Sequence, residues 1–336
     1  MAVPFSKPHA IKSSSDDAAA SNIWKFAVRM GGRHQVFICL LSLVVAAVSV
    51  APIELQKRIV NDAIEPRNLD MLITLGALFL AAILLRRVLK FLFAVYQDWL
   101  SQSAIVYCRK HLIGLQLGKI GAAAASDSHQ GDSDSGQTVS VVQSEIDKVG
   151  RFVGTGLSDP VADGAKLLFV FGYMLVVDPM VTVVAMAFFI PQFLFVPLMQ
   201  KVLNRLIREK TDHVRDMSDR ISSLDASDSD VPEGTSQVIA DIFSNEMKST
   251  FYKQLIKAGI NILNSLAPLS VLVFGGYLFI QGETSLGVIV AFVSGFEQMA
   301  APTRALVQYY RVASIKNEQH EKIAHWIDDR VLASRR

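Results

Sequence analysis

Seven charged residues stand inside stretches of the chain that are otherwise apolar. Four are basic and three are acidic: Arg86, Arg87, Lys90 and Lys166, and Asp159, Asp163 and Glu297. A four-residue spacing places Arg86 and Lys90 on one helix face, and likewise Asp159 and Asp163. Charges in hydrocarbon are costly, so they mark ion pairs between helices or groups that line a substrate or ion pathway. We find no catalytic nucleophile–base arrangement and no metal-ligand spacing, so we expect neither kind of centre in this chain.

The elements that must carry these charges are long apolar runs. The 336 residues are 51% hydrophobic and 19% charged, with a mean hydropathy of +0.34, whereas a soluble domain has about 25% charged residues. A hydrocarbon layer of about 30 Å needs roughly 20 helical residues. We predict six spans, at about 36–55, 69–96, 157–177, 180–199, 260–280 and 286–307. The net charge of +2 gives no indication of nucleic-acid binding.

Basic residues are distributed unequally over the two sides that these spans define. One side, which holds both termini and the two long loops, has 26 Lys and Arg residues, whereas the other has three. The positive-inside rule therefore predicts a multi-pass protein of the inner (plasma) membrane with both termini in the cytoplasm. We expect residues 1–21 to be a disordered tail, 22–329 the transmembrane domain and 330–336 a C-terminal tail. Residues 22–30 suit a short helix lying in the membrane surface, or the start of the first span.

Counted from the outer ends of their runs, the basic and acidic groups overlap in depth. Arg86 to Lys90 lie about 17 to 21 residues from Leu69, and Asp163 and Asp159 about 15 and 19 residues from Asp178, at a rise of about 1.5 Å per residue. One interpretation is an ion-paired contact between the second and third spans, or snorkelling to the inner interface. The other is a polar patch in a substrate cavity. Glu297, near mid-bilayer, is a partner for a group such as Arg86, a contact for a cationic substrate, or a proton carrier.

Both long inner loops have the pattern of helix–turn–helix excursions. Helical spacing continues past the second span to Ile120, resumes over 137–152, and recurs over 200–224. Between these helices lie turns rich in Asp, Ser and Gly, at about 126–134 and 225–234.

Local motifs in this arrangement resemble the membrane domain of type I ABC exporters. Residues 52–64 (PIELQKRIVNDAI) look like the end of that family's first span, and residues 136–149 like the segment after its first coupling helix. Residues 230–246, with Gly234 and Glu246, resemble the region of the second coupling helix, although Asp230 stands where Glu is usual and Pro232 differs from the usual sequence. Residues 282–292 resemble the start of the last span. The resemblance covers about 22–329.

The resemblance implies an all-α membrane protein with six transmembrane helices and long cytoplasmic helical extensions. It implies a twelve-span homo- or heterodimer in the lipid bilayer, which works by alternating access. ATP and Mg²⁺ would be bound by partner nucleotide-binding domains, with no cofactor on this chain. The sequence contains no Gly-x-x-x-x-Gly-Lys-Ser/Thr motif, so we do not expect this chain to be an ATPase by itself. Candidate contacts to the ATPase are the loop-tip residues Ser128, His129, Gln130, Asp132, Asp230, Pro232, Glu233 and Gly234.

Two other functions remain open at this point. An ion-coupled transporter of the same fold would use Glu297 and the Asp159/Asp163 pair as a proton relay. A membrane scaffold without transport is the third reading, and the acidic tips are then solvated turns. The sequence gives no indication of the substrate.

Overall fold

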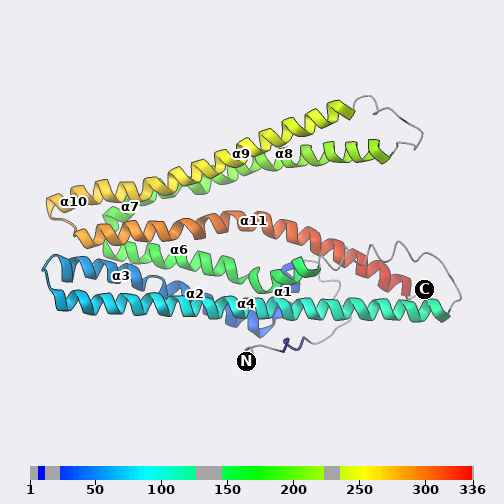
Figure 1. Cartoon of the computed structure of the whole chain (residues 1–336), viewed down its shortest axis with the longest axis horizontal. Helices are drawn as coiled ribbons and strands as arrows, with labels where there is room; N and C mark the ends of the chain where they lie inside the picture. Colours follow the sequence, from blue (N-terminus) through cyan, green and yellow to red (C-terminus); the bar gives the residue numbers. More distant parts are fainter. Residues whose placement is uncertain (1–6, 12–22, 126–145, 223–234, 335–336) are drawn as a thin grey trace. The chain divides into compact units, whose positions relative to one another are not determined.

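The computed structural model (Figure 1) describes residues 7–11, 23–125, 146–222 and 235–334. Within these ranges every regular element is a helix, which confirms the all-α prediction. The helices form two compact units, the first of Met1–Tyr173 with Gln298–Arg336, and the second of Met174–Glu297. Two helices, α6 (Ser158–Val177) and α11 (Leu286–Ser334), run from one unit into the other.

The first unit is built around α4, the longest described helix. Its other complete elements precede α4 in the chain: α1 (Ile23–Gly31), α2 (Arg33–Val48), α3 (Ala51–Arg58) and the π-helical η1 (Ile59–Ile64). Both α2 and α3 pack along α4 (Leu69–Ala125). The 57 residues of α4 extend about 86 Å at about 1.5 Å per residue, almost three times a hydrocarbon layer of about 30 Å. The predicted continuation of the second span as a helix is therefore confirmed.

Helix α1 is amphipathic and buries its apolar side in protein. The helix predicted over residues 22–30 is thus present, and the apolar residues that suggested a membrane-surface helix pack against other helices. Their neighbours come from α4, from the helical residues 146–155 and from α11. The cluster consists of Ile23, Phe26, Ala27, Met30, Leu100, Ala104, Val149, Phe152, Val153 and Ala313.

A close crossing joins residues 146–155 to α4. A Cβ atom added to Gly154 would lie 2.2 Å from the Gln97 carbonyl oxygen and 2.3 Å from Ser101 Oγ, so the crossing accepts only glycine there without movement. The Ser101 hydroxyl donates to the Arg151 carbonyl at 3.1 Å. The Tyr309 hydroxyl of α11 donates to the Gly156 carbonyl, which ties a third helix to the same place.

The second unit contains a long helical hairpin. Its elements are α7 (Pro179–Phe189), α8 (Pro191–Ser222), α9 (Thr235–Ser270), the π-helical η2 (Val271–Gly275) and α10 (Gly276–Gln281). Helices α8 and α9 lie side by side (Figure 1). Asp178 caps α7 by accepting the N–H groups of Met180 (3.2 Å) and Val181 (3.1 Å) and the Thr284 hydroxyl (2.8 Å).

Five described helical segments are long and apolar enough to cross a bilayer: Arg33–Ile64, Leu69–His111, Ile146–Val177, Ser236–Gln281 and Leu286–Tyr309. They contain the predicted first, second, third, fifth and sixth spans. The predicted fourth span instead falls on the 11-residue α7 and the start of α8. Pro191 separates the two helices because proline lacks an N–H and its ring clashes with the carbonyl four residues earlier. Ile190, between the two helices, keeps helical angles (φ −59°, ψ −40°).

Candidate functional site

Two cations predicted from the sequence converge on one residue that the sequence analysis missed. The Arg86 guanidinium donates to Gln298 Oε1 at 2.8 Å, and Lys166 Nζ donates to the Gln298 backbone carbonyl at 2.8 Å. The side chains come from α4, α6 and α11, and all three residues are half-buried in the first unit. These contacts define a polar centre, which we name the Gln298 cluster: Arg86, Lys166 and Gln298.

Pro302 explains why Lys166 reaches a backbone carbonyl inside a helix. The Gln298 carbonyl of a regular helix would accept the N–H of the residue four positions on. That residue is Pro302, buried within α11, and it has no N–H. Membrane interiors offer no water to a freed carbonyl, so the protein must supply the donor. The Lys166 ammonium does so, and a lysine in one span thereby compensates a proline in another.

The acidic residues have other partners. Gln97 Nε2 donates to Asp159 Oδ1 and to Ser158 Oγ, both at 2.7 Å, and Ser158 donates to the Gly154 carbonyl at 2.6 Å. Asp163 is close enough for its charge to act on Lys166 and Lys90. Among the described ion pairs, none joins Arg86, Arg87, Lys90 or Lys166 to either aspartate. The second and third spans are therefore joined by the hydrogen bonds of Gln97. The sequence had suggested ion pairs between these spans as one interpretation.

The remaining candidates of the predicted pathway are exposed in this chain. Arg87 and Lys90 lie on the exposed side of α4, and Glu297 is exposed on α11 directly before Gln298. Gln97 and Gln298 carry no charge, which is why a search for charges passed over them. The signal that could have found Gln298 is its position four residues before a proline inside an apolar run.

A second polar centre of the first unit involves Tyr173, about two helical turns after Lys166 on α6. Glu54 accepts from Lys57 Nζ (2.8 Å), Arg58 Nε (2.7 Å) and the Tyr173 hydroxyl (2.8 Å). The Lys57 ammonium also lies 5.8 Å from the centroid of the Tyr173 ring. Every charged member of this centre has an opposite charge in contact, so it joins α3 to α6 as a structural tie.

The predicted coupling residues Ser128, His129, Gln130, Asp132, Asp230, Pro232, Glu233 and Gly234 all lie outside the described residues. The helices that lead to the second tip are held together by polar contacts. Lys210 Nζ lies 2.6 Å from Glu246 Oε2, and Asn245 Nδ2 donates to Glu209 Oε2 at 3.3 Å. These pairs join α8 to α9 along the stem of the hairpin.

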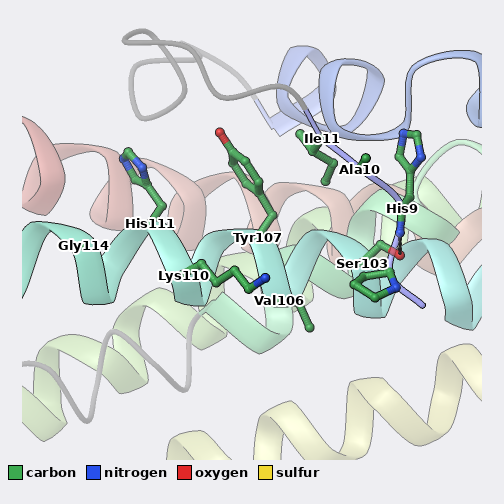
Figure 2. A pocket seen from close by; sticks show the side chains of 10 residues that line it. His9, Ala10, Ile11, Ser103, Val106, Tyr107, Lys110, His111 and Gly114 are labelled. Atoms are coloured by element: carbon green, nitrogen blue, oxygen red, sulfur yellow. Dashed lines mark hydrogen bonds between the residues drawn. The ribbon is translucent and has the colours of Figure 1, made fainter. Parts of the chain in front are cut away.

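A cavity of about 650 Å³ lies between residues 8–11 and α4. Figure 2 shows Tyr107, Lys110 and His111 of α4 on one side and His9 and Ile11 on the other. The His9 N–H donates to Ser103 Oγ at 2.9 Å, and the Trp99 indole donates to the Lys7 carbonyl at 2.9 Å. Residues 7–11, which composition assigns to a disordered tail, thus contact the long helix.

Comparisons with known proteins agree on one family. A model of the ABC transporter transmembrane region matches residues 36–223. The chain is 23% identical over 295 residues to the "Putative multidrug export ATP-binding/permease protein YgaD" of Bacillus subtilis, covering 82% of this chain and 49% of that protein. It is 22% identical over 240 residues to a protein of the same description, SAB1799c of Staphylococcus aureus, covering 68% of this chain and 40% of that one. The chain spans about half the length of these relatives or less.

Proposed function

Because the chain belongs to the ABC transporter transmembrane region family, we propose that it forms the substrate pathway of an ABC-type exporter. The pathway opens alternately to the two sides of the membrane. The work is supplied by ATP hydrolysis in nucleotide-binding domains outside these 336 residues, which bind the ATP and Mg²⁺. A second transmembrane subunit, identical or different, completes the pathway.

The observation that carries this proposal is the length of the helices compared with the bilayer. The 32 residues of α8 and the 47 residues of 235–281 extend about 48 Å and about 70 Å at about 1.5 Å per residue, against hydrocarbon of about 30 Å. A membrane pore needs no such overhang. Rigid helices that project from the membrane, tied by Lys210 and Glu246, are suited to pass a displacement from an ATPase to the spans. The match to ATP-binding/permease proteins supports the same reading.

The proposed orientation places both helical loops and both termini in the cytoplasm of a cell with the chain in its inner membrane. The test is a cysteine at Ser128 or Gly234 in a background with Cys39 and Cys108 replaced by serine. A membrane-impermeant maleimide should label either tip only after the cells are permeabilised, and an outer control at Arg67→Cys should react at once. Labelling of a tip in intact cells would contradict the proposal.

The proposed ATPase contact is tested by activity that copurifies with the chain. We expect vanadate-sensitive ATP hydrolysis in the chain purified from its native membrane in mild detergent. The charge reversal Glu233→Lys at the tip should remove most of that activity. The matched change Asp212→Lys, on the exposed side of α8, should leave it. Equal activity in the two variants would exclude the tip from the contact, and no ATPase activity in any preparation would overturn the exporter proposal.

A further inference from the structure

Within the part of the chain that the structure describes, the two positive charges of the Gln298 cluster have no negative partner in contact. Arg86 donates to a neutral amide and Lys166 to a backbone carbonyl, and no carboxylate among the described residues accepts from either. A guanidinium has five N–H donors and an ammonium three, so most of their donors remain unused. Charges at this depth are normally paired or placed for function. The Glu54 centre in the same unit, with its ion pairs complete, is the internal contrast.

The two neutral acceptors, Gln298 Oε1 and the Gln298 carbonyl, do not explain why the donors are charged. A glutamine side chain or an asparagine would satisfy the freed Gln298 carbonyl without burying an ammonium, and an uncharged amide would serve Gln298 Oε1. The charges that act on Lys166 are those of Arg86 and Lys90, which are positive, and of Asp163, which is negative. Glu297, directly before Gln298, is exposed. A second cation would be repelled here. An acidic group would be attracted, since its oxygens accept the donors that Arg86 and Lys166 leave free.

The cluster lies within apolar segments. Arg86 is in Leu69–His111 and Lys166 is in Ile146–Val177, and both segments are long and apolar enough to cross a bilayer. An acidic group held at the cluster would therefore place an attached hydrocarbon or aromatic body against apolar side chains. The two requirements together describe an amphipathic anion, with one carboxylate, sulfonate or phosphate on an apolar body.

We propose that Arg86 and Lys166 bind the acidic group of an amphipathic organic anion, which is the substrate class of this pathway. Only the statement that the anion is a substrate rests on the proposed transport function. Binding of the anion by Arg86 and Lys166 requires no ATPase. Arg86 exchanges its hydrogen bond to the neutral amide of Gln298 for hydrogen bonds to an anion, in which donor and acceptor are both charged and the guanidinium can bind in a bidentate way. Lys166 keeps the Gln298 carbonyl with one N–H and offers the others. Gln298 thus holds the two cations in place while the site is empty of ligand.

The test measures binding of two dansyl probes of matched length to the full chain in phosphatidylcholine nanodiscs. One probe is 11-(dansylamino)undecanoate, and the other carries a trimethylammonium group in place of the carboxylate. The anion should bind at least about tenfold more tightly than the cation, and Arg86→Gln and Lys166→Gln should each weaken it about tenfold or more. Arg67→Gln, which removes an exposed positive charge elsewhere in the same unit, should have no effect. Equal affinity for the two probes, or unchanged anion affinity in Arg86→Gln, overturns the proposal.

A second variant protects the test against loss of the fold. Gln298→Ala leaves both cations and frees Arg86, so it should bind the anionic probe as tightly as the original chain or more tightly. Weakening by Gln298→Ala equal to that by Arg86→Gln would show that the cluster is structural only. Repeating the measurement in nanodiscs that contain the anionic lipid phosphatidylglycerol shows whether the site binds a lipid headgroup or a free organic anion. If this lipid displaces the probe, the site holds a lipid headgroup, and if it does not, the substrate class stands. The copurifying ATP hydrolysis, measured on the same variants, reports separately on the exporter proposal.

Discussion

A thermodynamic cycle on Lys166 and Pro302 tests the physical origin of the Gln298 cluster. Lys166→Met removes the donor to the Gln298 carbonyl, and a buried carbonyl left without a donor costs about 1–3 kcal/mol. The same change also removes the unfavourable free energy of burying an ammonium. The two effects on the free energy of unfolding have opposite signs, so the single change Lys166→Met does not test the hydrogen bond. Pro302→Ala restores a backbone N–H four residues after Gln298 and removes the ring clash, which together are worth about 3 kcal/mol in a helix interior.

The cycle isolates the hydrogen bond because the desolvation of Lys166 enters both backgrounds equally. In the Pro302→Ala background, the Gln298 carbonyl has its own helical donor, so Lys166→Met should be more favourable by about 1–2 kcal/mol than in the original chain. The measurement is reversible unfolding in mixed micelles with increasing dodecyl sulfate, followed by helical circular dichroism. Lys25→Met, at an exposed position of α1, should change by the same amount in both backgrounds. An effect of Lys166→Met that is equal in the two backgrounds would refute the reasoning.

Two further changes test the packing in each unit. Gly154→Ala places a Cβ 2.2 Å from the Gln97 carbonyl oxygen, so it should lower the free energy of unfolding by about 1–3 kcal/mol. Gly164→Ala, whose Cβ meets nothing within 4 Å, should not lower it. Equal effects of the two changes would contradict the close crossing. Asp178→Ala removes the cap of α7 and the acceptor of the Thr284 hydroxyl. In the same unfolding assay it should lower the free energy of unfolding by about 0.5–2 kcal/mol. Thr284→Val should lower it less, because Asp178 still accepts from the two backbone N–H groups.

Apolar runs and helix ends were predictable because they depend on local sequence. The start of α7 has an acidic cap followed by a proline, and α10 ends at Gly282, whose φ of 79° suits glycine. Pro191 is also visible in the sequence, and the predicted fourth span runs through it, whereas the structure has α7 end at Phe189 and α8 begin at Pro191. Length alone identifies a span, but proline decides whether it is one helix.

The partner of Arg86 was not predictable in the same way. Depth counting placed Arg86 level with two aspartates, yet the residue that accepts from it is 212 positions along the chain and uncharged. Which face of α4 meets α6 and α11 depends on how each helix is rotated, and a three- to four-residue spacing does not determine that rotation. Close crossings determine it instead, through Gly154 at one point and the Tyr309 hydroxyl at another.

Two prolines lie inside apolar helices, Pro268 in α9 and Pro302 in α11. Among the described contacts, only at Pro302 does a charged side chain contact the carbonyl that the proline leaves without a donor. Pro268 removes the donor of the Asn264 carbonyl, and the π-helical turn Val271–Gly275 begins three residues after this proline. Pro302 removes the donor of the Gln298 carbonyl, and the compensation comes from Lys166 in another helix. A neutral amide side chain could donate to the Gln298 carbonyl without a buried charge. The ammonium at Gln298 is thus more than a repair of the backbone needs, and this excess leads us to assign a ligand of opposite charge to the cluster.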